Sequence, residues 1–95
     1  MRRYNQPMNE HELMAQLNRE GFGHTYVCED EAHAHYPEHT HRTETAHIIL
    51  SGEMTLAMAG ETETYRSGER CDVPAGALHA AKMGPGGCRY LVGER

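Results

Sequence analysis

The sequence lacks several features that would point to particular classes of protein. It contains a single lysine, Lys82, and its formal net charge at pH 7 is −5. Because nucleic-acid binding depends on clustered positive charge, this balance argues against a nucleic-acid partner. The three cysteines, Cys28, Cys71 and Cys88, are odd in number and form no C-x-x-C pair. They therefore argue against a disulfide framework and a cysteine-based zinc site, and each is expected to be a small buried residue.

Long apolar segments are also missing. No apolar run approaches the roughly 18 residues that a membrane-spanning helix needs, so no membrane partner is expected. Residues 1–7 lack the apolar segment of a signal peptide, and the expected location is the cytoplasm. A chain of 95 residues is expected to form one structural domain. Its core would be marginal unless a metal ion or a second copy of the chain supports it.

The first part of the sequence has the signals of one short amphipathic helix. Asn9 and Glu12 have the spacing of a capping box, in which each side chain bonds the backbone of the other residue. Leu13 and Leu17 belong to an apolar stripe, and Gly21 stands where a C-terminal cap belongs. The preceding residues are expected to be a loose arm, and the helix is expected to cover one end of a barrel.

The rest of the chain has the pattern of short strands. We expect an N-terminal arm and helix over residues 1–21 and a β-barrel over residues 22–95. Turns are predicted at Ser51-Gly52, at Tyr36-Pro37-Glu38 and, from glycine content, at residues 84–87. Such turns between alternating segments predict an all-β sandwich or barrel. The expected strands are residues 24–28, 46–50, 53–58, 61–65, 68–73, 78–83 and 88–92.

Histidine is the residue type that stands out. Of the eight histidines, six lie between His24 and His47. His39 and His41 are one residue apart, which places both side chains on one face of an extended strand. His79 follows a Pro-x-Gly turn, and a closed barrel could bring it to the other two. Neutral imidazoles that converge in this way bind zinc, copper, iron or nickel, so the sequence predicts a metal site.

These residues resemble the two motifs of the cupin family, whose members are small jelly-roll barrels. The first motif is matched at His39, His41 and Gly52. The second motif is matched at Gly68, Pro74, Gly76 and His79. The resemblance covers roughly residues 25–93 and implies a double-stranded β-helix, here with a short N-terminal helix. We call His39, His41 and His79 the motif histidines.

The family would carry its metal on the motif histidines and a glutamate, but the glutamate position holds Thr45. Three arrangements remain open. His47, two residues further along the same strand face, could be the fourth ligand. Alternatively, the motif histidines form a three-nitrogen face and His47 stands beside it as an acid/base group. In the third arrangement, a local register change re-aims Glu44 and restores the carboxylate.

The resemblance implies one divalent transition-metal ion per chain, with zinc, iron, copper, nickel and manganese as candidates. The leading hypothesis is a metal-dependent enzyme, oxygenase- or isomerase-like, acting on a small oxygenated organic molecule. The alternatives are a cupin that binds metal or ligand without turnover, as a sensor or store, and a metal that only braces the fold. A homodimer is expected, because such small barrels commonly pair. Candidates for the pocket wall are Ile49, Leu56, Cys71 and Tyr90, whereas Met54 and Met58, on the same stripe as Leu56, are expected to be core residues.

Overall fold

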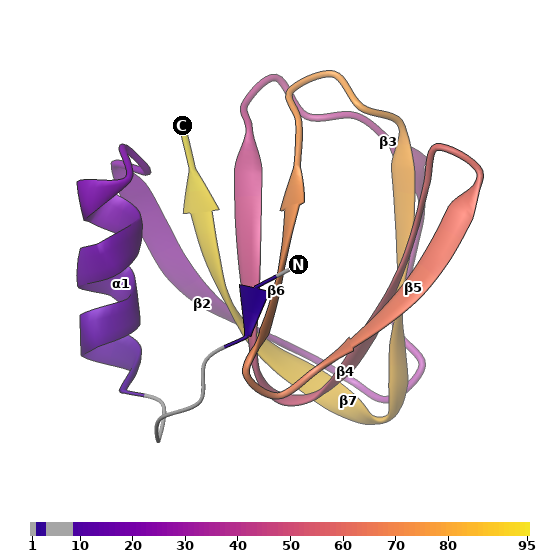
Figure 1. The fold of residues 1–95 in the computed structure, drawn as a ribbon. Helices are drawn as coiled ribbons and strands as arrows, with labels where there is room; N and C mark the ends of the chain where they lie inside the picture. Colours follow the sequence, from indigo (N-terminus) through magenta and orange to yellow (C-terminus); the bar gives the residue numbers. More distant parts are fainter. Residues whose placement is uncertain (1, 4–8) are drawn as a thin grey trace.

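The computed structural model describes residues 2–3 and 9–95 (Figure 1). In these residues one helix accompanies a seven-stranded antiparallel sheet, which confirms the all-β expectation. No described helix is long and apolar enough to cross a membrane. The elements are β1 (Arg2–Arg3), α1 (Glu10–Arg19), β2 (His24–Asp30), β3 (His35–His39), β4 (Thr45–Met58), β5 (Glu61–Arg66), β6 (Glu69–Val73) and β7 (His79–Glu94).

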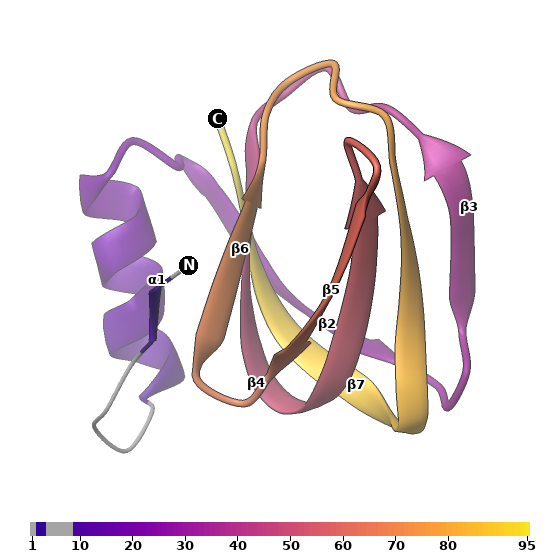
Figure 2. The ribbon, with the colours of Figure 1, turned by 45° about the vertical axis from the view of Figure 1, so that its right-hand side comes forward.

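The two longest strands, β4 and β7, form the spine of the fold. They pair with each other from Thr45↔Glu94 to Met58↔His79. One half of this pair is flanked by β6 and β2, and the other half by β5 and β3. The spine bends between its halves, so the sheet folds over on itself (Figures 1 and 2). The result is a jelly-roll barrel with an interior open at one end.

The turns predicted at Ser51-Gly52 and at residues 84–87 are wrong, because β4 and β7 continue through both segments. The glycines bend the strands instead of reversing them. The register shifts so that residues 84–87 of β7 stand opposite the single residue Glu53. Gly52 has a φ of 76°, and a Cβ there would lie 2.1 Å from the carbonyl oxygen of Gly87. Only glycine allows this close crossing of the two strands.

Strand β3 was not expected, since Tyr36-Pro37-Glu38 resembles a turn. Proline lacks an N–H donor, so within a sheet it is confined to an edge or an irregular position. β3 pairs with β7 alone, and the register shifts between Tyr36 and His39, which is where Pro37 lies. This edge strand matters for function because it carries His39 to the open end of the barrel.

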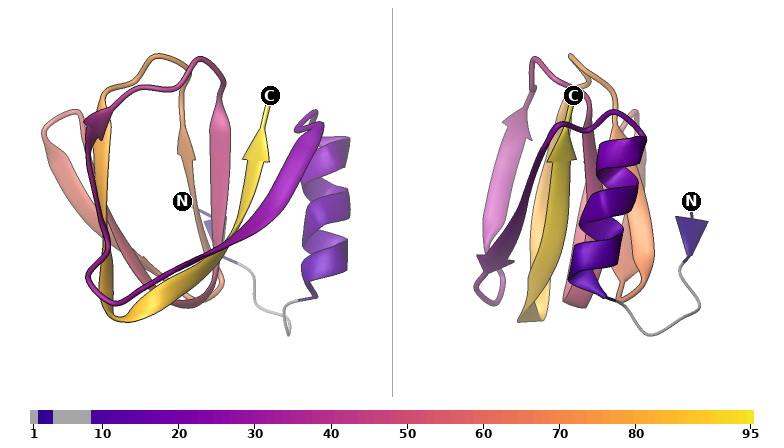
Figure 3. Two further views of the ribbon diagram at one scale, coloured as in Figure 1. Left: turned by 180° about the vertical axis from the view of Figure 1, so that it is seen from behind. Right: turned by 90° about the vertical axis from the view of Figure 1, so that its left-hand side faces the viewer.

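Helix α1 begins as the capping pattern predicts, with the Asn9 side chain accepting a hydrogen bond from the Glu12 amide at 3.2 Å. Its buried residues are Leu13 and Leu17. The helix lies on the outer face of the sheet beside β2 and β7, rather than over a barrel end (Figure 3). The expected loose arm lies mostly outside the described residues, except that Arg2–Arg3 pairs with β6.

The barrel wall separates two apolar clusters. The outer cluster lies between the helix and the sheet, and it consists of Leu13, Leu17, Phe22, Ala46, Ile48, Leu50 and Leu91. Close packing here depends on Gly93, where a Cβ would come within 3.0 Å of the Phe22 Cβ. The inner cluster lies on the opposite face of the sheet and includes Ile49, Met54, Cys71, Met83, Cys88 and Tyr90. Burial of Cys71 and Cys88 agrees with their expected role as small core residues, whereas Cys28 is half-buried.

Candidate metal centre

The three motif histidines converge at the open end of the barrel. His39 ends β3 and is paired with His79, the first residue of β7. Their potential ligand atoms, together with those of His41, all lie within 4.8 Å of one another. The three ring centroids are 4.2–5.0 Å apart. The described residues contain no other group of three or more histidines, cysteines and carboxylates arranged in this way.

The route by which His41 reaches this group differs from the prediction. Strand β3 ends at His39, so His41 lies in the following loop and not on the same strand face. The carbonyl of His41 accepts a hydrogen bond from the Gly76 amide at 2.9 Å. This bond ties the loop of the first motif to the Pro74–Gly76 turn of the second, just before His79. A hydrogen bond between two loops therefore positions His41, whereas strand pairing brings His39 and His79 together.

Backbone hydrogen bonds orient two of the three rings. The Nδ1 atom of His39 lies 2.7 Å from the carbonyl oxygen of Pro37, and that of His79 lies 2.9 Å from the carbonyl oxygen of Ala77. A carbonyl oxygen only accepts, so both Nδ1 atoms carry the proton and donate it. In the neutral ring this leaves the lone pair on Nε2, which is the form in which imidazole binds a metal ion.

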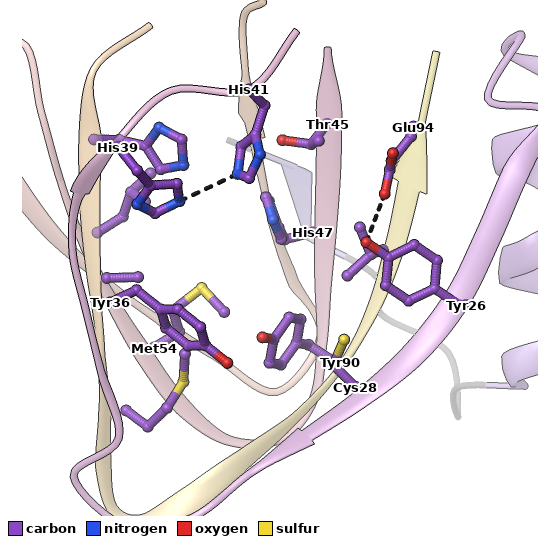
Figure 4. Close-up of a pocket in the computed structure, with 15 residues that line it drawn as sticks. Tyr26, Cys28, Tyr36, His39, His41, Thr45, His47, Met54, Tyr90 and Glu94 are labelled. Carbon is purple, nitrogen blue, oxygen red and sulfur yellow. Dashed lines mark hydrogen bonds between the residues drawn. The ribbon is translucent and has the colours of Figure 1, made fainter. Parts of the chain in front are cut away.

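The spacing and protonation of the nitrogens fit a shared metal ion. The Nε2 atoms of His39 and His41 are 3.2 Å apart (Figure 4). Two nitrogens bound tetrahedrally to one zinc ion at about 2.0–2.1 Å would be about 3.3–3.4 Å apart. Burial lowers the pKa of His41, and the neighbouring His39 and His79 lower it further. A neutral ring is what a metal ion requires, so the donor set suits a transition metal.

The wall beside the motif histidines carries two buried polar atoms without partners. Thr45 is 4% exposed, and neither its Oγ1 nor the Nδ1 of His47 has a hydrogen-bond partner. Burial lowers the pKa of His47 to about 4, so its ring is neutral at pH 7. His47 is absent from the group of converging ligand atoms. It stands one pleat deeper than Thr45 on the cavity side of β4.

Glu44, the other candidate for a fourth ligand, is engaged elsewhere. Its backbone exchanges two hydrogen bonds with Arg95, at 2.9 and 3.0 Å. Its carboxylate Oε1 accepts from the Arg95 Nε at 2.5 Å. This ion pair holds the side chain away from the motif histidines. The geometry of the described residues therefore favours a three-nitrogen face over a restored three-histidine, one-glutamate set.

A cavity of about 220 Å³ opens beside the motif histidines. Of the wall candidates named from the sequence, Leu56 and Tyr90 line it, whereas Ile49 and Cys71 do not. Met54, expected to be a core residue, is buried in the inner cluster and lines the cavity as well. Sequence reasoning missed Tyr26, Cys28, Tyr36 and Glu94. The period-two alternation of Tyr26 and Cys28 in β2 was a signal for two of them. The full lining is Tyr26, Cys28, Tyr36, His39, His41, Thr45, His47, Met54, Leu56, His79, Ala81, Met83, Tyr90, Val92 and Glu94.

Each tyrosine in the wall donates its hydroxyl proton to a carboxylate. Tyr26 donates to Glu94 at 2.6 Å. Tyr36 and Tyr90 donate to the two oxygens of Asp30, at 2.8 and 2.6 Å. Burial and the carboxylates raise the pKa of all three phenols, so they are neutral donors at pH 7. These bonds hold the rings in place around the cavity, and Figure 4 shows the bond from Tyr26 to Glu94.

Comparison with known proteins agrees with this architecture. The family model described as "Cupin domain" matches residues 26–92. The DMSP lyase DddQ from Ruegeria pomeroyi DSS-3 has a similar structure, with a TM-score of 0.69 and 30% identity over 75% of this chain and 36% of that chain. The chain thus spans about a third of the length of DddQ. No curated protein matches the chain.

Two further structures are similar over most of the chain. Protein NMB1881 from Neisseria meningitidis has a TM-score of 0.64 and 25% identity, over 74% of this chain and 70% of that chain. KdgF from Halomonas sp. has a TM-score of 0.63 and 18% identity, over 75% of this chain and 67% of that chain. At 18% identity, the second likeness supports the fold alone.

Proposed function

The chain belongs to the cupin family, and from that premise we propose that the motif histidines bind one divalent transition-metal ion for a reaction on a small oxygenated organic molecule. The convergence of three imidazoles carries this proposal, because two of them have Nε2 lone pairs set by backbone hydrogen bonds. An all-nitrogen donor set favours zinc, iron, copper or nickel over magnesium or calcium. The likeness to DddQ, named a lyase, favours an enzyme over a passive binding protein.

A three-nitrogen face supports a catalytic role, because a metal ion bound there would keep coordination positions open toward the cavity. A bound metal ion would act there as a Lewis acid on an oxygen of the ligand. Side chains of the cavity wall would hold the ligand and exchange protons with it. The unpartnered Thr45 Oγ1 and His47 Nδ1 are available to hold a polar group of the ligand or a water molecule. His47 is neutral, and a neutral imidazole can donate or accept a proton at such a group.

Metal analysis of two matched variants tests the proposal. His79→Ala removes a proposed ligand, whereas His11→Ala removes an exposed histidine of α1. We expect about one metal ion per chain in the unsubstituted protein and in His11→Ala, and less than about 0.1 in His79→Ala. Equal metal content in both variants would overturn the proposed site. Retention of the fold after chelation would show that the barrel does not need the metal ion to stay folded.

Cobalt substitution tests whether coordination positions are open. Azide should bind the cobalt(II)-loaded protein and change its visible absorption spectrum, because three protein ligands leave room for it. The same change is expected in His47→Leu, since His47 stands outside the ligand group. If azide changes the spectrum of His47→Leu but not that of the unsubstituted protein, His47 is the fourth ligand. The protein would then be better described as a closed metal-binding cupin without turnover.

A further inference from the structure

One side of the cavity wall has a composition of its own. Three tyrosine rings line it, Tyr26 from β2, Tyr36 from β3 and Tyr90 from β7. In Figure 4, Tyr36 and Tyr90 lie below the labelled histidines, and Tyr26 lies to one side beside Glu94. We call Tyr26, Tyr36 and Tyr90, with the carboxylates of Asp30 and Glu94, the tyrosine end of the cavity.

The electrostatic character of the tyrosine end is negative. The face of an aromatic ring carries negative potential and attracts cations. Each phenol here also donates to a carboxylate, at 2.6–2.8 Å, which adds electron density to the ring and places an anion behind it. Both features act in the same direction. A positively charged group in this part of the cavity would be attracted by the rings and by two carboxylates.

Compensating positive charge is missing from the wall. Among the described residues that line the cavity there is no lysine and no arginine. An anion at the tyrosine end would therefore be repelled by the two carboxylates and would find no lysine or arginine among the described wall residues to offset them. The wall selects for a cation or for a neutral group.

We propose that the tyrosine end binds the cationic head of a small organic ligand, such as a quaternary ammonium group, while an oxygen at the ligand's other end points to the motif histidines. This inference rests on the proposed function, in that the same cavity takes a small molecule. It adds the charge class of that molecule. Aromatic side chains packed around a quaternary ammonium are a recurrent way of recognising such groups. A cavity of about 220 Å³ suits a ligand of a few heavy atoms.

Binding of two probes of equal shape tests the proposal. Choline carries a quaternary ammonium, and 3,3-dimethylbutan-1-ol replaces its nitrogen with carbon and is neutral. Titration calorimetry of the full chain should show choline binding at least fivefold more tightly than the alcohol, because only choline gains the cation–ring attraction. Equal binding would reduce the tyrosine end to an apolar wall and overturn the proposal, as would tighter binding of 3,3-dimethylbutanoate to metal-free protein.

Variants of one exposed tyrosine locate the effect. Tyr36 is 41% exposed, so replacing it does not empty the core. Tyr36→Phe keeps the ring and should bind choline within about twofold of the unsubstituted protein. Tyr36→Leu loses the ring and should bind choline several-fold more weakly, with little change for the neutral alcohol. Glu94→Gln should likewise weaken choline alone. If Tyr36→Leu and Glu94→Gln both leave choline binding unchanged, the cation is not recognised at this end.

Metal content separates this inference from the proposed function. Each titration is made on protein as purified and again after chelation. A preference for choline that persists in the chelated protein supports the tyrosine end whether or not the motif histidines bind metal. Loss of metal in His79→Ala with no preference for choline would uphold the metal centre and refute the cation site.

Discussion

The two faces of the β4–β7 spine differ in chemistry although the same stretches of backbone build both. On the outer face Ala46, Ile48 and Leu91 are fully buried in one apolar cluster with Leu17 and Phe22. On the inner face the alternate residues of the same strands line the cavity, and they are Thr45, His47, Tyr90, Val92 and Glu94. The period of two along each strand separates the two sets completely.

The difference shows how a chain of 95 residues combines stability with a binding site. The outer face stabilises the fold by burying apolar side chains under α1. The inner face contains buried polar atoms without partners, Thr45 Oγ1 and His47 Nδ1, and each costs free energy in the folded state. Stability provided on one side of the wall offsets the cost of a polar, hollow interior on the other.

The largest expected effect is the loss of stability that follows when the apolar cluster of the outer face is disrupted. Phe22 is fully buried between α1 and the sheet. Phe22→Ala should lower the free energy of unfolding by about 3–5 kcal/mol, because it leaves a cavity in a dry cluster. Leu78→Ala is the control, since Leu78 is 55% exposed and its loss should cost less than about 0.5 kcal/mol. Urea unfolding in the presence of a chelator measures both, and similar losses would show that the outer cluster does not dominate stability.

The next effect concerns the inner face and depends on pH. The pKa of His47 is about 4 in the folded protein and about 6.5 in the unfolded chain. Between these pH values the unfolded chain binds a proton on His47 and the folded protein does not. The contribution of His47 to the free energy of unfolding is therefore fully present above pH 6.5 and is lost as the pH falls toward 4. The loss should reach about 3 kcal/mol, at 1.36 kcal/mol per pKa unit.

The variant His47→Leu isolates this contribution. In metal-free protein its unfolding free energy should fall less steeply than that of the unsubstituted protein between pH 6.5 and pH 4. Unfolding by urea at a series of pH values measures the two slopes. Parallel curves would mean that His47 is not held in the neutral form by burial.

A smaller effect tests how closely the helix approaches the sheet. A Cβ at Gly93 would lie 3.0 Å from the Cβ of Phe22 and 3.2 Å from the Cδ1 of Leu17. Gly93→Ala should therefore cost about 1–3 kcal/mol through overpacking. Gly86→Ala lies in the same strand with no atom within 4 Å of the added Cβ, and it should cost much less. Thermal unfolding of both variants compares them, and equal stability would show that the outer face can relax.

The smallest expected effects are changes in stability of opposite sign at two threonines of β4. Thr45→Val removes a buried hydroxyl without a partner and should stabilise the metal-free protein by about 1 kcal/mol. Thr55→Val removes a hydroxyl that bonds the Thr64 hydroxyl at 2.8 Å, and it should destabilise by about 1 kcal/mol. Differential scanning calorimetry measures both shifts. A loss of stability in Thr45→Val would indicate that its hydroxyl is satisfied in solution.

Local patterns in the sequence determined the class of fold and part of the candidate site. Capping at Asn9, alternation along the strands and the spacing of the two histidine motifs each depend on residues close in the chain. They predicted the helix, the all-β barrel and the convergence of the motif histidines. The same patterns predicted turns where the strands continue, because a glycine is expected both where a strand reverses and where, as at Gly52, it crosses another strand closely.

Only the tertiary structure decided which residues complete the cavity. Tyr26 meets Glu94 across 68 residues of sequence, and Tyr90 meets Asp30 across 60. Glu44 turns to Arg95 rather than to the histidines, although it stands beside the position of the missing carboxylate. Such pairings follow from the register of β7 against β2 and β4. Register is set by burial over whole strands, and no short stretch of sequence contains that information.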